Sequence, residues 1–335
     1  MRKITLALSL FLLLGAGCLS QESALTSEVD TPSEALPVLD DNQSWHAVSV
    51  PALMATDFDG RDFEVGEVLA YEDAYTRYAI SYMSGELRIT GIMNVPTGDG
   101  PFALLMLNHG YIDPAIYTTG RGLKREQDYF ARDGFVVIHS DYRNHAGSDD
   151  DADYQLTLRL GYAIDVANAI VAVTQADLPY IDTDRVGMFG HSMGGGIAQA
   201  IAVAAPELVD AIILYAPVSG DAWENYEQYT SRRADESDLI LEAYGDRAAN
   251  ADFWREASAA TYYDQVDDAV MIHIGTLDDS TPPAWSYAIA EQLEDLQKDV
   301  TLHVYENERH EFGSQWSEMM RRSAEFFKSE LDLVQ

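Results

Sequence analysis

The chain has 335 residues, 47% of them apolar, which is enough for one large hydrophobic core or two smaller ones. Its 56 acidic and 21 basic residues give a formal net charge of −35. Such a surface repels phosphate backbones and anionic lipid headgroups, so we expect no nucleic-acid partner. An acidic, lysine-poor surface is typical of proteins that work in high salt, and an acidic surface kept for solubility is an equally good interpretation.

The first eighteen residues have the pattern of an export signal. Residues 1–3 carry positive charge, residues 4–14 form an apolar run too short to span a bilayer, and small residues precede Cys18, the only cysteine. The pattern resembles a bacterial lipoprotein signal, although Gly15 stands where leucine is commonest. We expect residues 1–18 to be a signal peptide that ends at a lipidated Cys18, because a single cysteine cannot form an internal disulfide. An ordinary cleaved signal is the alternative.

Residues 19–44 are rich in serine, threonine, aspartate, glutamate and proline and contain little that could pack. We expect this segment to be a flexible tether and residues 45–335 to be the folded domain. A lipid on Cys18 would attach that domain to a membrane. The sequence therefore predicts an exported protein at the cell surface or in the periplasm, with an unknown oligomeric state.

From Trp45 onward, short apolar runs alternate with helical patterns. Two alternating segments, 78–83 and 87–95, predict an antiparallel hairpin. Apolar runs predict further strands at 102–107, 135–139, 186–189, 211–215, 270–274 and 301–305. Helical patterns lie between them at 124–133, 155–175, 197–205 and 291–296. Strands interleaved with helices in this way predict an α/β fold, a mostly parallel central sheet with helices on both faces.

The segment from about residue 221 to 264 interrupts this alternation. It is polar, aromatic and helical in pattern, and we expect it to be a cap insertion over the carboxyl edge of the sheet. Its Trp223, Tyr226 and Tyr229, together with Trp285 further along the chain, either line an acyl or aromatic pocket or pack the cap itself.

The stretch Gly190-His191-Ser192-Met193-Gly194 follows one predicted strand and precedes a predicted helix. The pattern G-x-S-x-G in this setting is the nucleophile elbow of α/β-hydrolases, whereas a glycine-rich turn before a helix is its ordinary structural interpretation. We predict that Ser192 is a nucleophile. We also predict that the backbone N–H of Met193, at the helix N-terminus, donates to an oxyanion.

A serine nucleophile needs a base and an acid that orients the base, and in this fold both follow the serine in the chain. Only His273, His303 and His310 follow Ser192, and the first two lie inside predicted strands. His310 lies in a loop after the last strand, so we predict that it is the base. Asp278, in the loop after strand 270–274, is the predicted acid, and its neighbour Asp279 is the competitor.

The second oxyanion donor is expected in the loop that follows strand 102–107. Gly110 allows the chain to bend there, and we predict that the backbone N–H of Tyr111 is this donor. His109 precedes Ser192 in the chain, so we expect it to be structural.

Taken together, these stretches resemble the catalytic domain of the prolyl oligopeptidase and acylaminoacyl-peptidase family and its single-domain esterase relatives. The likeness runs from about residue 78 to 327. It rests on Asn108-His109-Gly110, Asp141-Tyr142-Arg143, Gly190 to Gly195, Gly275 to Asp279 and Arg309 to Phe312. The resemblance implies a Ser192, Asp278 and His310 triad. Those peptidases carry a propeller domain before the hydrolase, whereas only about ninety residues, partly tether, lie between Cys18 and His109 here.

The sequence thus predicts a serine hydrolase that cleaves carboxylic esters through an acyl-enzyme intermediate. A peptidase acting on short or N-blocked peptides is the alternative, and a non-catalytic binding protein is a remote third. We expect no cofactor and no metal. The acidic run Asp149-Asp150-Asp151, with Asp153, lacks the spacing of a calcium loop and predicts a solvated turn.

Overall fold

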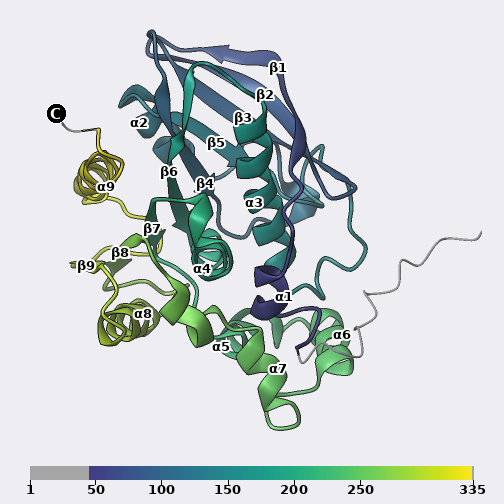
Figure 1. Cartoon of the computed structure of the whole chain (residues 1–335). Coiled ribbons are helices and arrows are strands. Elements are labelled where there is room, and N and C mark those ends of the chain that lie inside the picture. The colour runs from purple at the N-terminus through teal and green to yellow at the C-terminus, as the bar shows by residue number, and fades with distance from the viewer. Residues whose placement is uncertain (1–44, 334–335) are drawn as a thin grey trace, which may run out of the picture. The chain divides into compact units, whose positions relative to one another are not determined.

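The computed structural model describes residues 45–333; the predicted signal peptide, Cys18 and tether lie outside them. Nine strands form one sheet in the order β1-β2-β3-β5-β4-β6-β7-β8-β9 (Figure 1). The strands are β1 Arg61–Tyr71, β2 Tyr75–Ser84, β3 Leu87–Pro96, β4 Phe102–Asn108, β5 Val136–Ser140, β6 Ile181–His191, β7 Ala211–Tyr215, β8 Ala269–Gly275 and β9 Val300–Tyr305. The pairs from β5 through β4 to β9 are parallel, and β1, β2 and β3 add antiparallel strands at one edge. The predicted α/β architecture is confirmed.

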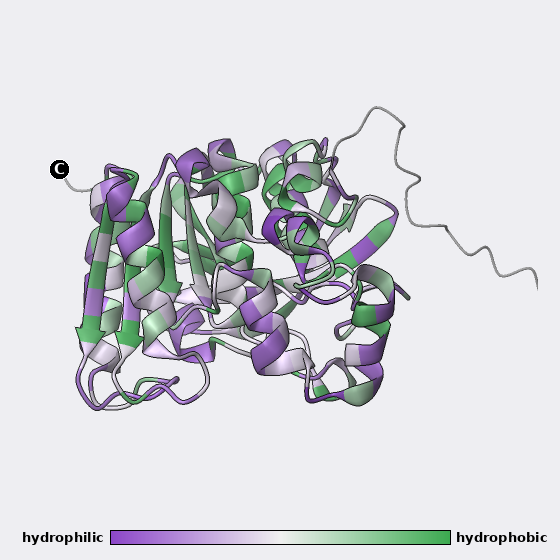
Figure 2. Cartoon of the chain, turned by 90° about the horizontal axis from the view of Figure 1, so that it is seen from below, coloured by the Kyte–Doolittle hydropathy of each residue, from purple (hydrophilic) through white to green (hydrophobic). Residues whose placement is uncertain are grey.

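Helices cover both faces of the sheet. One face packs against α1 Val50–Met54, α3 Leu160–Gln175, α4 Met193–Ala204 and α8 Pro283–Asp295. The other packs against α2 Lys124–Arg132 and α9 Trp316–Glu330. Apolar residues gather on the strands and on the helix faces turned toward them (Figure 2). No helix in the described part of the chain is both long enough and apolar enough to cross a membrane.

The central strands are buried on both faces, which explains why they form unbroken apolar runs in the sequence. Every residue of β5 and β7 is buried. The predicted hairpin is β2–β3, closed at the pair Ser84–Leu87. The first strand of the sheet, β1, has six consecutive exposed residues. The pairing of β1 with β2 shifts register at three places, so its apolar residues do not keep the period-two alternation of a strand, and β1 was not predicted.

One predicted helix begins later than expected. The helical pattern of residues 155–175 predicted a start at Gln155, whereas α3 begins at Leu160. Leu158 and Arg159 have φ angles of 50° and 76°, and this left-handed conformation is uncommon for residues with a side chain. The chain therefore turns sharply just before α3.

The segment between β7 and β8 is helical. It contains α5 Ala222–Asn225, a π-helical turn η3 Tyr226–Thr230, α6 Ala234–Tyr244, α7 Ala251–Glu256 and the 3₁₀ segment η4 Ala259–Gln265. These helices lie together beyond the end of the sheet (Figure 1). They share a small core in which the completely buried Trp254 packs against Tyr226 and Phe253, and Tyr244 stacks on Phe253.

Candidate active site

Ser192 occupies a sharp turn between β6 and α4. Its backbone has φ 56° and ψ −119°, a sparsely populated conformation that costs about 1–3 kcal/mol and is held only where the surroundings impose it. The N–H of Ser192 donates to the Tyr215 carbonyl at 3.0 Å. Its carbonyl accepts hydrogen bonds from Gly195 and Val218 at 2.9 and 3.2 Å. The end of β7 and the first turn of α4 thus fix the turn.

The flanking glycines are needed because other backbone atoms approach them closely. A Cβ atom on Gly194 would lie 1.9 Å from the carbonyl oxygen of Asn108, and one on Gly190 would lie 2.3 Å from that of Gly194. Such distances are impossible for real side chains. The spacing of the motif therefore follows from how tightly α4 packs against the ends of β4 and β6.

His310 and Asp278 are joined by a hydrogen bond. The Nδ1 atom of His310 lies 2.9 Å from Oδ2 of Asp278. The Asp278 carboxylate is buried and also accepts hydrogen bonds from the Ser280 N–H, the Thr281 N–H and the Thr281 hydroxyl, at 2.8–2.9 Å. Burial acts to raise the pKa of Asp278, but hydrogen bonds from His310 and Thr281 outweigh it and lower the pKa below its usual value. The carboxylate is ionised at neutral pH and can hold the imidazole by Nδ1.

Asp279 points elsewhere. Its side chain is 71% exposed, and Oδ2 lies 3.2 Å from Nη1 of Arg309, which is also exposed. The loops that carry the two partners of the hydrogen bond are tied together, since the Leu277 N–H donates to the Glu308 carbonyl at 2.9 Å. Of the two candidate acids, only Asp278 is within hydrogen-bonding reach of His310.

The His310 loop reaches the strand that precedes Ser192. Nε2 of His191 lies 3.2 Å from the His310 carbonyl oxygen, and the two rings lie 4.6 Å apart between centroids. Burial is the main cause that lowers the pKa of His191 to about 3, so neutral His191 donates this bond. Among the hydrogen bonds of the described residues, none joins the Ser192 hydroxyl to His310.

The loop after β4 passes next to Ser192. A Cβ atom on Gly110 would lie 3.1 Å from Cβ of Ser192, so a side chain there would crowd the serine. Tyr111, the next residue, lines the same cavity as Ser192 and Met193. Three of the predicted site residues therefore border one space.

The other histidines considered in the sequence analysis have structural surroundings, and His109 and His273 are fully buried. His109 is fully buried and stacks on Tyr142 with 4.3 Å between ring centroids; its Nδ1 lies 2.7 Å from the Gly110 carbonyl. Desolvation lowers its pKa well below the usual range. His273 and His303 lie in β8 and β9 and stack on each other at 5.4 Å.

Two residues of the acidic run 149–153 interact with neighbouring arginines. Asp149 accepts a hydrogen bond from the Arg88 N–H at 2.8 Å, and Asp151 pairs with Arg143 at 2.8 Å. Arg143 also forms two hydrogen bonds with the buried carboxylate of Asp165. Asp149 and Asp151 thus fix the loop that leads to α3, while Asp149, Asp150 and Asp153 are exposed, as predicted for a solvated turn.

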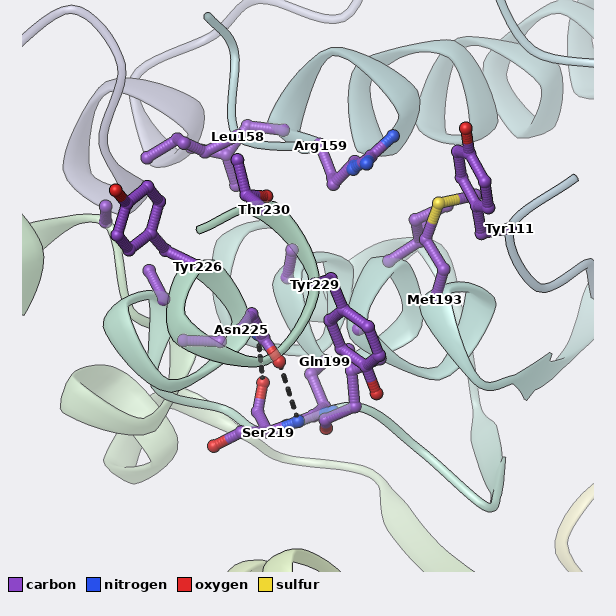
Figure 3. Close-up of a pocket in the computed structure, with 18 of the residues that line it drawn as sticks. Tyr111, Leu158, Arg159, Met193, Gln199, Ser219, Asn225, Tyr226, Tyr229 and Thr230 are labelled. Atoms are coloured by element: carbon purple, nitrogen blue, oxygen red, sulfur yellow. Dashed lines mark hydrogen bonds between the residues drawn. The ribbon is translucent and has the colours of Figure 1, made fainter. Parts of the chain in front are cut away.

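A cavity of about 160 Å³ opens beside Ser192. Figure 3 shows Tyr111 and Met193 on one side of it, Tyr226 on the other, and Arg159 and Tyr229 between them. The π-helical turn η3 is fixed here, because the Tyr229 hydroxyl donates to the Ser280 carbonyl at 3.0 Å. Of the aromatic residues singled out in the sequence, Tyr226 both lines the cavity and packs the insertion. Sequence reasoning missed Arg159 and Arg233, which line the cavity together with Glu236.

Comparison with known proteins identifies related sequences. Residues 122–333 match the prolyl oligopeptidase family. Human prolyl endopeptidase FAP is 30% identical over 184 residues, which cover 54% of this chain and 23% of that protein. An uncharacterized protein of Mycobacterium bovis is 35% identical over 118 residues, which cover 35% of this chain and 29% of that protein. The chain spans less than a third of the length of these relatives.

Solved structures share the fold. An acetyl xylan esterase from Paenibacillus sp. R4 has a TM-score of 0.63 at 18% identity, over 82% of this chain and 91% of that chain. An acylaminoacyl peptidase from Pyrococcus horikoshii has a TM-score of 0.62 at 20% identity, over 77% of this chain and 42% of that chain. Since the family match covers well over half of the sequence, the chain belongs to the prolyl oligopeptidase family and is a serine hydrolase with the α/β-hydrolase fold.

Proposed function

We propose that this serine hydrolase cleaves carboxylic esters through a triad of Ser192, His310 and Asp278. The observation that carries the assignment is the 2.9 Å hydrogen bond between His310 and the buried Asp278, in a loop held against the strand that ends at the strained Ser192. A strained turn of this kind between a strand and a helix exposes the hydroxyl of the nucleophile at the helix N-terminus. The backbone N–H groups of Met193 and Tyr111 are the proposed oxyanion donors.

The reaction proceeds by acyl transfer. His310 Nε2 takes the proton of the Ser192 hydroxyl as its oxygen attacks the ester carbonyl, and the resulting oxyanion accepts hydrogen bonds from Met193 and Tyr111. His310 then protonates the leaving alcohol as the carbon–oxygen bond breaks. Water, deprotonated by His310, releases the acid from Ser192. The bond from Ser192 to His310 is expected to form when substrate binds, as catalytic hydrogen bonds often tighten in the substrate complex.

Esters are favoured over peptides for a chemical reason: an alcohol leaves more readily than an amine. All nine strands described in residues 45–333 belong to one sheet, so the cavity beside Ser192 is bordered by the hydrolase domain and its helical insertion. The alternative is a peptidase for short or N-blocked peptides. It is supported by the relationship to a prolyl endopeptidase over 54% of the chain.

The test is a parallel turnover assay on residues 45–335, with p-nitrophenyl esters and with aminoacyl and acylaminoacyl anilides. Ester turnover that is at least a hundredfold faster than anilide turnover is the expected result, and comparable anilide turnover would favour the peptidase. Ser192→Ala should abolish both activities while the melting temperature stays within a few degrees. Turnover that survives this substitution would refute the assignment of the nucleophile.

We also propose, from the sequence alone, that residues 1–18 are a lipoprotein-type signal peptide and residues 19–44 a tether. In bacterial cells that express the full chain, Cys18→Ser should move the protein from the membrane fraction to the soluble fraction. An unchanged distribution would contradict lipid attachment at Cys18.

A further inference from the structure

Two arginines stand at the N-terminal ends of helices, where arginine is an unfavourable residue for helix stability. Arg159 is the N-cap residue of α3 and Arg233 is the N-cap residue of α6, and neither side chain makes a capping hydrogen bond. N-caps favour serine, threonine, aspartate and asparagine, and a cation there lies against the positive end of the helix dipole. Arg159 also has the left-handed φ of 76°. Positions that break local rules in this way are expected at functional sites.

Both arginines border the cavity next to Ser192, although they lie far apart in the chain. Their Cζ atoms lie 5.3 and 4.8 Å from the centre of the Tyr111 ring, within the range of a cation–π interaction. Their side chains are 31% and 40% exposed, so both guanidinium groups remain accessible. Tyr111 thus connects the proposed oxyanion loop to a pair of cations.

The charges of the two arginines are not balanced by neighbouring carboxylates. Glu236 is the only carboxylate within ion-pair distance of either guanidinium in the described part of the chain. Its Oε2 lies 3.0 Å from Nη1 of Arg233, and its Oε1 lies 3.8 Å from Nη2 of Arg159. Two cations therefore share one anion, which leaves one net positive charge in a protein whose formal charge is −35. A positive cavity wall on so acidic a protein favours an anionic ligand.

The cavity lies on the acyl side of the proposed reaction. His310 must protonate the leaving alcohol, so the alcohol departs on the side of His310. The described residues that line the cavity include Ser192, Met193 and Tyr111 but not His310. The acyl group is therefore the part of the ester that extends toward Arg159 and Arg233.

We propose that the cavity binds an acyl chain that ends in a carboxylate, so that the substrate is an ester of a dicarboxylic acid whose second carboxyl group is free. Planar guanidinium groups bind carboxylates through paired hydrogen bonds, and the Glu236 carboxylate already lies between the two arginines. The remaining walls include Leu158, Ile197 and Tyr226, which suit the methylene groups of the chain. This inference rests on the proposed ester hydrolysis and specifies its substrate class.

The test compares two esters of equal acyl length, mono-p-nitrophenyl adipate and p-nitrophenyl hexanoate, at pH 7.5 and 0.15 M salt. The quantity measured is the ratio of kcat/KM for the adipate half-ester to kcat/KM for the hexanoate. The native protein should give a ratio above ten. Arg233→Gln should lower the ratio about tenfold, and Arg159→Gln combined with Arg233→Gln should lower it about a hundredfold.

A substitution that is expected to raise the kcat/KM ratio distinguishes loss of carboxylate binding from loss of folding. Glu236→Gln leaves both arginines without a carboxylate partner, so it should raise the ratio at least threefold, a change that damage to the fold would not produce. Arg321→Gln is the matched control: it removes one positive charge from an exposed residue of α9 that pairs with Glu318 and Glu325, and it should leave the ratio unchanged.

The outcomes separate the two proposals. A protein that hydrolyses the hexanoate ester but gives a ratio of one or less, or a ratio that Arg233→Gln and Glu236→Gln do not move, overturns the carboxylate inference alone. A protein that hydrolyses neither ester overturns the proposed ester hydrolysis and this inference with it.

Discussion

His191 donates a hydrogen bond from Nε2 to the carbonyl oxygen of His310 at 3.2 Å, so the residue before the proposed nucleophile holds the loop of the proposed base. The two rings also lie against each other, 4.6 Å apart and tilted by 37°. The motif position between glycine and serine thus has a structural role, because its side chain sets the position of the His310 backbone relative to the end of β6.

Replacing His191 by phenylalanine tests this relationship. The aromatic ring can still pack, but the hydrogen bond to the His310 carbonyl is lost. Since a displacement of about 1 Å in a catalytic group can cost about a hundredfold in rate, we expect kcat to fall ten- to a hundredfold while KM changes little. Ester kinetics together with a thermal melt would check this. A kcat within twofold of the native value would show that the bond does not position His310.

The two neighbouring aspartates give a matched pair of variants. Asp278→Asn removes the carboxylate that holds His310 by Nδ1, and loss of the corresponding acid in a serine triad costs about 10⁴-fold in kcat. Asp279→Asn removes only an exposed contact with Arg309, and exposed ion pairs contribute little to stability. We therefore expect kcat for ester hydrolysis to fall about 10³- to 10⁴-fold in Asp278→Asn and less than about twofold in Asp279→Asn. Equal losses would contradict the assignment of the acid.

Much of the geometry of the candidate site was predictable because the motifs that form it are local in the sequence. The elbow at Ser192 needs glycines on both sides, and the serine must follow a strand and precede a helix, so the motif and its setting appear together in the chain. His310 could be chosen because only three histidines follow Ser192. The choice between Asp278 and Asp279 depended on which carboxylate turns inward, and a sequence does not record that orientation.

The cavity was not predictable for a different reason. Its walls come from the loop before α3 and from the insertion between β7 and β8, so Arg159 and Arg233 meet only in the folded chain. The left-handed backbone at Leu158 and Arg159 leaves no sequence signal, since neither residue is glycine or asparagine. Strand β1 was missed because its pairing with β2 shifts register at three places, which breaks the period-two apolar alternation by which a strand is recognised.

Buried histidines should make the protein sensitive to acid. Burial is the main cause that lowers the pKa of His139 to about 4, that of His191 to about 3 and that of His109 well below its usual value. In the unfolded chain each has a pKa near 6.5, so the unfolded state binds more protons below that pH. The free energy of unfolding therefore has its full value above about pH 6.5 and falls as the pH drops toward 4, by about 1.4 kcal/mol per pH unit for each histidine.

His139 allows this pH dependence to be isolated. Both of its ring nitrogens are buried without a hydrogen-bond partner in the described residues, and its ring stacks on His109 at 5.1 Å. His139→Phe keeps an aromatic ring there and removes the titrating group. Urea unfolding should give free energies within about 1.5 kcal/mol of the native protein at pH 7.5 and a shallower loss between pH 6.5 and 5. An unchanged slope would show that His139 does not contribute to the acid sensitivity.

The tight approach of α4 to β4 leads to a last prediction, on the elbow itself. A Cβ atom on Gly194 would meet the carbonyl oxygen of Asn108 at 1.9 Å. This oxygen belongs to the backbone at the end of a buried strand and cannot turn aside as a side chain can. Overpacking of this kind costs about 3 kcal/mol or more, so Gly194→Ala should lower the urea midpoint markedly and abolish ester turnover, because Ser192 and Met193 would move with the helix.

Gly196→Ala is the matched comparison in the same helix. The nearest atom to a Cβ there is a methyl carbon of Val218, at 2.6 Å, and that side chain can change its rotamer. We therefore expect a loss of stability of about 1 kcal/mol and ester turnover that is reduced but measurable. If Gly194→Ala were tolerated as well as Gly196→Ala, the close contact between α4 and the Asn108 carbonyl would not be what requires glycine in the motif, and the physical explanation of its spacing would fail.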